Sequence, residues 1–118
     1  MTHPRIAAVA TAVPSHRFTQ GELLAMAGYG DERRRGFFSA SDIAGRHLYI
    51  DPASFRPNET VDELNERFSR GALELGESAA RTALARAGWM PGDVDFLATT
   101  TCTGIGRASC RERVYVLV

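Results

Sequence analysis

The chain has 118 residues, its 14 basic and 14 acidic side chains give a formal net charge of zero, and 44% of its residues are hydrophobic. This length suits one small domain, and the composition is that of a globular chain rather than a disordered one. A neutral balance provides no general attraction to nucleic acid or to an anionic membrane, and no apolar run reaches the roughly 20 residues of a membrane span. Two cysteines make no disulfide framework, so we expect a reducing, cytoplasmic setting.

The first half of the chain predicts short elements separated by loops. The apolar run 5–13 (RIAAVATAV) predicts a strand that ends at the following proline. A helix is expected after Thr19 as its N-cap and is closed by Gly28. Acidic residues precede basic ones over 31–38, which predicts a second short helix. Residues 41–50 are interpreted as a loop that leads into a short strand.

A long helix is expected next, because apolar residues recur every three or four positions and would share one face. This stripe consists of Val61, Leu64, Phe68, Ala72, Leu75, Ala79, Ala83 and Ala87. Asn58 or Thr60 is expected to cap the helix, and Glu63 stands at the capping-box position if Thr60 is the cap. Gly88 is expected to end it.

After the long helix, residues 91–93 (PGD) predict a turn, and the β-branched run 94–101 predicts a strand buried on both faces. The resulting order of elements is that of an α/β chain. Two principal strands and one long helix cannot cover both faces of such a sheet, so we expect the front part of a larger domain. Strands of this kind tend to end at binding crevices, which directs attention to residues 99–104 (TTTCTG).

The end of the predicted strand carries a thiol and several hydroxyls. No histidine lies near Cys102 in the sequence to activate a thiolate, and a small buried residue is the simpler interpretation. The hydroxyls of 99–103 either line a polar pocket or fill a β-branched strand, and the sequence leaves both interpretations open. Cys102 and Cys110 are eight positions apart without a neighbouring histidine pair, so no metal site is predicted.

A basic cluster is formed by Arg33, Arg34 and Arg35. Three guanidinium groups at one helix end suit phosphate groups, which accept bidentate hydrogen bonds. The alternative is a solvated surface on which these arginines pair with Asp31 and Glu32.

The last residues, 105–118 (IGRASCRERVYVLV), do not continue the pattern of the preceding strand. The segment IGRASCRERV resembles the conceptual translation of a common sequencing adapter, so we interpret 105–118 as a non-native read-through tail. The alternative is a genuine basic turn followed by a short strand over 114–118. Cys110 and the neighbouring arginines are therefore given no functional weight.

Three segments taken in order resemble the N-terminal part of type III polyketide synthases, the chalcone-synthase-like branch of the thiolase superfamily. They are AVATAVP with the following Thr19 and Gln20, SDIAGRHLYID, and the long helix with LATTTCTG. The resemblance covers residues 5–104. It implies that 1–104 is the N-terminal part of a synthase domain with a partial thiolase-like fold, an incomplete part of an αβαβα domain.

The resemblance also implies an activity and its substrates. Family members are homodimeric acyltransferases that condense malonyl-CoA extender units onto an acyl-CoA starter, so CoA thioesters are substrates and no cofactor is implied. Their catalytic cysteine, histidine and asparagine cannot be placed in this chain, so no catalytic residue is assigned and the chain alone is expected to be inactive. By the same resemblance, Cys102 and Thr103 line the cavity for the starter and the growing polyketide.

For the basic cluster, the resemblance implies contact with the phosphates of CoA. Only Arg33 falls directly on a basic position of the family, and Gly36 and Ala40 stand where plant members carry further basic residues. The nearest alternative family is the ketoacyl-ACP synthase III branch, which shares an Arg-His pair like 46–47 and an Asn-Glu-Thr segment like 58–60. A small non-catalytic binding domain is the third interpretation.

Overall fold

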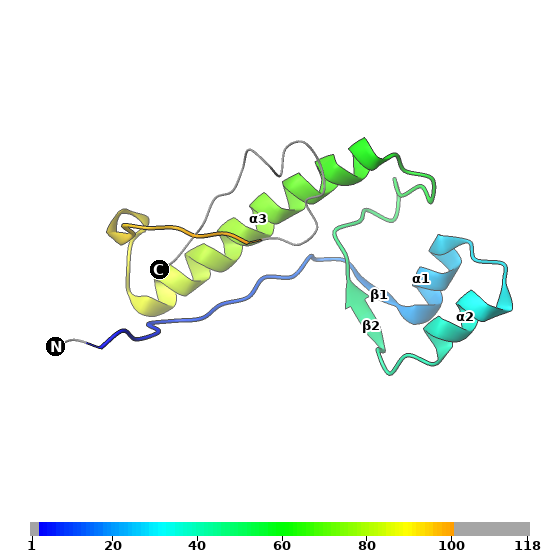
Figure 1. The fold of residues 1–118 in the computed structure, drawn as a ribbon, viewed down its shortest axis with the longest axis horizontal. Coiled ribbons are helices and arrows are strands. Elements are labelled where there is room, and N and C mark those ends of the chain that lie inside the picture. The colour runs from blue at the N-terminus through cyan, green and yellow to red at the C-terminus, as the bar shows by residue number, and fades with distance from the viewer. Residues whose placement is uncertain (1–2, 101–118) are drawn as a thin grey trace. The chain divides into compact units, whose positions relative to one another are not determined.

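The computed structural model describes residues 3–100 of the chain, which belong to two compact units. The hairpin unit is Val13–Leu64, and the helical unit combines Met1–Ala12 with Asn65–Val118. Figure 1 shows the elements in the order β1 (Arg17–Thr19), α1 (Gln20–Ala27), α2 (Glu32–Ser39), β2 (Gly45–His47), α3 (Val61–Ala87) and a 3-10 turn (Pro91–Asp93). The described residues therefore combine helices with a small antiparallel sheet, which is compatible with the predicted α/β class, and the thiolase-like arrangement stays a prediction.

The sheet of the hairpin unit has two antiparallel strands, in which Phe18 of β1 lies opposite Arg46 of β2. Phe18 is 6% exposed and is the one buried hydrophobic side chain among residues 3–100. Beyond the ladder, the Leu48 amide donates to the His16 carbonyl at 3.1 Å, and His47 Nδ1 lies 2.8 Å from the carbonyl oxygen of Pro14. The short strand expected within 41–50 is confirmed, whereas β1 was not predicted.

The two short helices begin and end where local chemistry predicts. Thr19 caps α1, because its Oγ1 accepts from the Glu22 amide at 3.2 Å while Glu22 Oε2 accepts from the Thr19 amide at 2.7 Å. Gly28 ends α1 in the left-handed conformation at φ 65°. Asp31 caps α2 by accepting from the Arg34 amide at 2.8 Å, which confirms the second short helix.

Helix α3 begins after a complete capping box, which decides between the two predicted caps. Thr60 Oγ1 accepts from the Glu63 amide at 3.3 Å, and Glu63 Oε2 accepts from the Thr60 amide at 2.7 Å, so Thr60 rather than Asn58 is the cap. Gly88 follows the helix at φ 72° and ends it as expected. Among residues 3–100, no helix is both long and apolar enough to cross a membrane.

The predicted apolar stripe of α3 is only partly covered. Its half-buried members are Phe68, Leu75, Ala79, Ala83 and Ala87. Its exposed members are Val61, Leu64 and Ala72. Other large apolar side chains of the helical unit are also exposed, including Leu73 at 74%. The periodicity therefore predicted the helix correctly, while the described residues supply only part of a partner for its apolar face.

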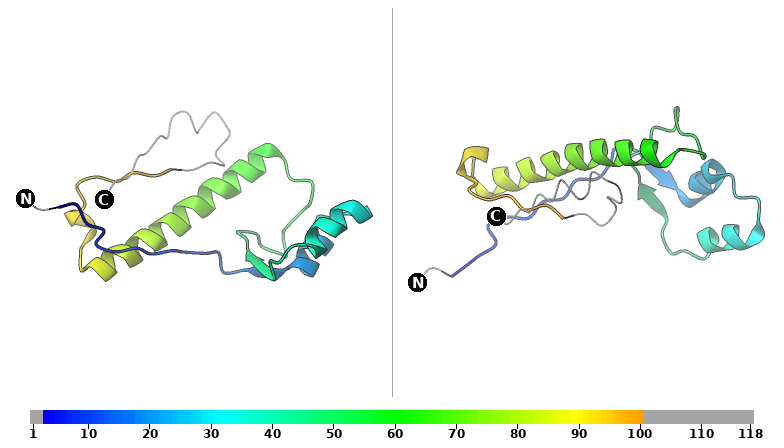
Figure 2. Two further views of the ribbon diagram at one scale, coloured as in Figure 1. Left: turned by 60° about the horizontal axis from the view of Figure 1, so that its bottom comes forward. Right: turned by 45° about the horizontal axis from the view of Figure 1, so that its top comes forward.

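The strand predictions over 5–13 and 94–101 are wrong for the described residues, which carry no strand there. Figures 1 and 2 show residues 5–12 and 94–100 running alongside α3 as extended segments, and Arg86 Nη1 of α3 donates to the Val9 carbonyl at 2.7 Å. A strand requires a hydrogen-bonded neighbour, and within residues 3–100 only β1 and β2 pair. Phe96 and Leu97 are 54% and 52% exposed, so this segment is not buried on both faces.

The capping boxes make the helix starts sensitive to acid. The hydrogen bond from the Thr60 amide, and then that from its hydroxyl, holds the pKa of Glu63 below its ordinary value. A carboxylate whose pKa is lowered on folding stabilises the fold above the unfolded pKa and loses this contribution as pH falls through the folded value. We expect the first turn of α3 to fray as pH falls below the ordinary pKa of a glutamate, measured by Thr60 amide exchange in NMR, and Glu63→Gln to remove this pH dependence. A first turn of α3 that opens over the same pH range in both proteins would contradict this.

Candidate functional site

The basic cluster lies on α2, and the structure gives its three arginines different surroundings. Arg34 contacts two neighbouring residues. Its Nε lies 3.1 Å from Asp31 Oδ2, and its guanidinium carbon lies 5.2 Å from the centre of the Tyr29 ring. The predicted alternative of a surface paired with acidic residues therefore holds for Arg34 and Asp31. Such an exposed ion pair and cation–π contact order the Arg34 side chain but add little stability.

Arg33 and Arg35 are exposed, and within residues 3–100 neither guanidinium makes an ion pair. Glu32, the other acidic residue of the predicted pairing, forms no ion pair there either. The carboxylate of Asp31 is paired with Arg34 and that of Glu32 stays unpaired among these residues. The cluster thus presents two guanidinium groups without an ion-pair partner, and their spacing of two positions places them on different sides of α2.

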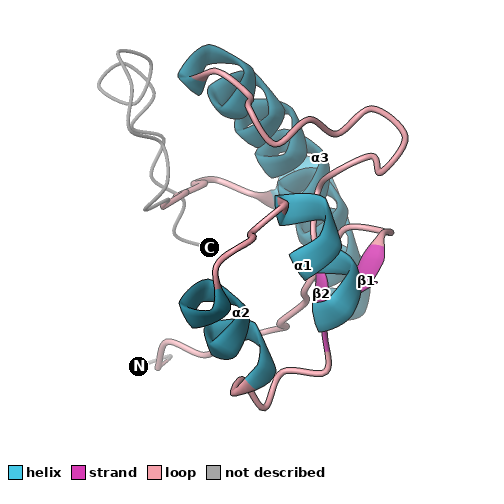
Figure 3. Ribbon diagram, turned by 90° about the vertical axis from the view of Figure 1, so that its right-hand side faces the viewer, coloured by secondary structure: helices cyan, strands magenta, loops and turns pink. Residues whose placement is uncertain are grey.

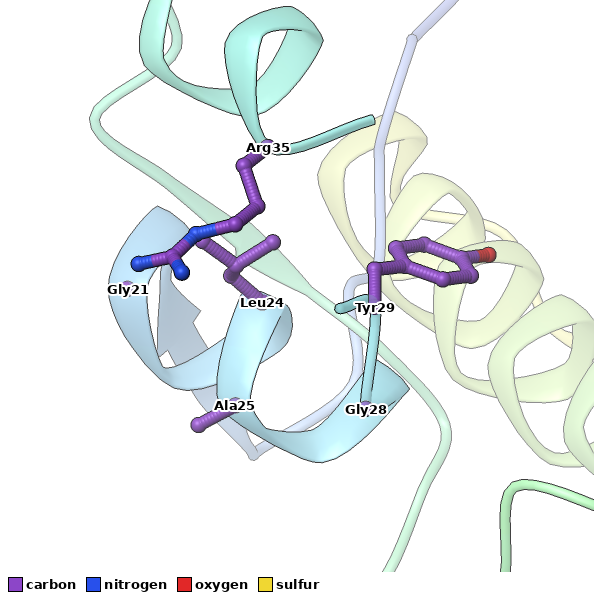
Figure 4. Close-up of a pocket in the computed structure, with 6 residues that line it drawn as sticks. All are labelled: Gly21, Leu24, Ala25, Gly28, Tyr29 and Arg35. Atoms are coloured by element: carbon purple, nitrogen blue, oxygen red, sulfur yellow. The ribbon is translucent and has the colours of Figure 1, made fainter. Parts of the chain in front are cut away.

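Arg35 lines an open, shallow pocket of about 370 Å³ between α1 and α2. The other lining residues are Gly21, Leu24, Ala25, Gly28 and Tyr29. Figure 4 shows the Arg35 side chain reaching across from α2 toward Gly21 and Leu24 of α1, with Ala25 on the next part of the same helix. Gly21 and Gly28 add no side chain to the pocket, so it stays open. The pocket therefore places the Arg35 guanidinium beside a small apolar surface.

Helices α1 and α2 lie side by side in the hairpin unit, as Figure 3 shows, and Phe38 of α2 makes one contact with α1 and one with the loop that follows it. Its backbone carbonyl accepts from Gln20 Nε2 at 3.3 Å, and its ring centre lies 6.0 Å from that of Tyr29. Phe38 is the half-buried residue of α2, whose other residues are exposed. Together with the contact of Arg34 with the Tyr29 ring, these two contacts hold α2, and with it the basic cluster, against α1 and the loop that follows it.

Sequence reasoning did not find Gln20 and Tyr29 as parts of this site. Tyr29 follows the left-handed Gly28, and a hydrophobic residue at that position commonly folds back against its neighbours. That signal was present in the sequence. The position of Gln20 opposite Phe38 depends on how two helices pack, which no local pattern reveals. Cys102 and Thr103, the predicted pocket residues, lie outside the described residues.

Gly28, which lines the pocket, and Gly36 of α2 allow a matched pair of substitutions. Gly28 has φ 65°, where a side chain is strained, so Gly28→Ala is expected to lower the free energy of unfolding by about 1 kcal/mol. Gly36 lies inside α2, and a Cβ there would meet nothing within 4 Å, so Gly36→Ala is expected to raise it by about 0.5–1 kcal/mol. Urea unfolding of the protein that carries this chain measures both. Equal effects of the two substitutions would contradict the assigned backbone conformations.

Comparison with known proteins shows two Streptomyces relatives. The chain is 34% identical over 104 residues to 3,5-dihydroxyphenylacetyl-CoA synthase of Streptomyces toyocaensis, which covers 86% of this chain and 27% of that protein. It is 29% identical over 118 residues to 1,3,6,8-tetrahydroxynaphthalene synthase of Streptomyces peucetius subsp. caesius, which covers 94% of this chain and 31% of that protein. The chain therefore spans less than a third of the length of either relative.

A third match, 32% identical over 81 residues, is to probable polyketide synthase 1 of Dictyostelium discoideum and covers 64% of this chain and 3% of that protein. No family model matches the chain, and no solved structure matches it significantly. Together the three relatives confirm the predicted resemblance to the type III polyketide synthases.

Proposed function

We propose that this chain, as a relative of the type III polyketide synthases, forms part of an acyltransferase that condenses malonyl-CoA units onto an acyl-CoA starter. The similarity to the two Streptomyces synthases supports the enzyme class. The chain would then be the N-terminal part of a larger thiolase-like domain in a homodimeric, cytoplasmic enzyme, with residues 105–118 as a non-native tail. No cofactor is proposed, because the CoA thioesters are the substrates.

Within this proposal, the helix pair α1 and α2 holds the phosphates of the CoA substrates. The observation that carries the assignment is that Arg33 and Arg35 are exposed and make no ion pair among residues 3–100, whereas Arg34 is paired with Asp31. Guanidinium groups bind phosphate oxygens through charge-assisted hydrogen bonds. The pocket beside Arg35 adds Leu24 and Ala25 as an apolar surface for less polar parts of CoA.

The chemistry of the reaction is assigned to residues other than those of α1 and α2. The family uses a cysteine that carries the acyl group as a thioester, and a histidine and an asparagine that stabilise the enolate and the oxyanion. No residue of this chain is assigned to these roles, so the chain alone is proposed to be inactive. Cys102 and Thr103 are proposed to line the starter cavity, where they would affect which starter and which product length fit.

A long sequencing read of the source locus across codon 104 tests this proposal, because it needs no assumption about folding. The proposal predicts an open frame that continues from Gly104 with a Gly-Cys motif and, further on, a histidine and an asparagine. A confirmed segment 105–118 followed by a stop codon would contradict the enzymatic role of this chain.

A further inference from the structure

Gln20, at the first position of α1, makes a hydrogen bond that is poorly suited to stabilising the fold. Its Nε2 donates to the Phe38 carbonyl at 3.3 Å, which is beyond the usual distance for such a bond. Its Oε1 is buried and has no hydrogen-bond partner in the structure. Burying an unsatisfied carbonyl costs free energy. The unpartnered Oε1 therefore offsets the stability that the Nε2 hydrogen bond contributes to the fold.

The same amide is well placed to fix the orientation of α2 about its own axis. Phe38 belongs to the last turn of α2, and Arg35 and Arg34 lie three and four positions before it on the same short helix. The Tyr29 ring holds the Phe38 side chain, while Gln20 holds its backbone carbonyl. Arg34 and Phe38, four positions apart on one face of α2, both contact the Tyr29 ring. The hydrogen bond from Gln20 to the backbone of α2 adds a separate point of attachment, which further restricts rotation of α2 about its axis.

We propose that Gln20 is a positioning residue, which fixes the rotation of α2 on α1 so that the Arg35 guanidinium group, which lines the pocket between the two helices, faces the CoA phosphates. This inference rests on the proposed role of α1 and α2 in binding the phosphates of CoA. Among residues 3–100 no hydrogen bond joins Gln20 to Arg35, so Gln20 acts through Phe38 and the backbone of α2.

A double-mutant cycle in the full-length protein that carries this chain tests the proposal, with free CoA as the probe in calorimetric titration. Gln20→Met keeps the length of the side chain and removes both polar ends, and we expect it to weaken CoA binding by about three- to tenfold. Gln20→Glu suits the helix start but sets a carboxylate against the Phe38 carbonyl, so it should weaken binding as well. If Gln20 acts through Arg35, neither variant should weaken binding further once Arg35 is alanine.

Thermal unfolding separates positioning from plain stabilisation. Because Gln20→Met removes the unpartnered buried carbonyl, its unfolding midpoint should stay the same or rise. A midpoint that falls together with CoA affinity would overturn the proposal, and so would an equal loss of affinity with and without Arg35. If the arginine substitutions weaken CoA binding and Gln20→Met does not, only the positioning role fails. If the arginine substitutions themselves change nothing, the proposed function fails and this inference with it.

Discussion

Replacing Arg33 and Arg35 together by alanine is expected to weaken CoA binding by about 30- to 100-fold in the protein that carries this chain. A hydrogen bond to a charged group contributes about 1.5 kcal/mol at the low end of its range, which suits exposed side chains and corresponds to about tenfold for each arginine. Neither guanidinium is engaged by a carboxylate among residues 3–100, so the full effect should appear in binding. Calorimetric titration with CoA measures it.

Arg34 provides the matched control on the same helix. Its guanidinium is held by Asp31 and by the Tyr29 ring, so Arg34→Ala should change CoA affinity less than threefold. Binding of CoA should also weaken as salt rises, and this salt dependence should be reduced in the Arg33 and Arg35 double variant. If all three arginines contribute equally, the division of roles within the cluster is wrong.

The second expected result concerns the chain of 118 residues on its own, which should bind a hydrophobic dye such as ANS with a several-fold rise in fluorescence over a folded globular control. The reason is the exposure of large apolar side chains on the helical unit. They include Ile6, Val9, Leu73, Met90, Phe96 and Leu97. Within residues 3–100 only Phe18, in the hairpin unit, provides a buried apolar side chain.

Single polar substitutions locate the dye-binding surface. Leu73→Lys and Phe96→Lys should each lower the dye signal, while Ala80→Lys, at an exposed small residue of α3, should leave it unchanged. Far-ultraviolet circular dichroism should show the same helix content in all three. Cooperative two-state unfolding of the isolated chain as a monomer, without dye binding, would instead favour a small self-contained binding domain.

The starts and ends of the helices could be predicted from the sequence because their chemistry is local. Thr60 with Glu63 forms its capping box within four residues, and Gly28 and Gly88 adopt left-handed backbone where a helix must end. The strands were predicted less well: the short strand within 41–50 was found, whereas β1 was missed and the strands expected over 5–13 and 94–101 are absent from the described residues. A run such as 94–100 has the composition of a strand, but pairing requires a neighbour that the run itself does not specify.

The site shows the same division between local and packed features. The basic cluster was visible as three consecutive arginines, and the pairing of Arg34 with Asp31 follows from a three-residue spacing on a helix. The pocket beside Arg35 and the contact of Gln20 with Phe38 arise only when α2 packs on α1. The roles of Cys102 and Thr103 stay predictions, since these residues lie outside the described part of the chain.

We propose that this chain belongs to an enzyme that uses free CoA thioesters, and one assay tests this proposal. The product of the complete source locus is incubated with malonyl-CoA and an acyl-CoA starter, without acyl carrier protein, and release of carbon dioxide and CoA is measured. We expect that carbon dioxide and CoA are both released and that a polyketide forms. A reaction that proceeds only when acyl carrier protein is supplied would contradict it and would favour the ketoacyl-ACP synthase III branch.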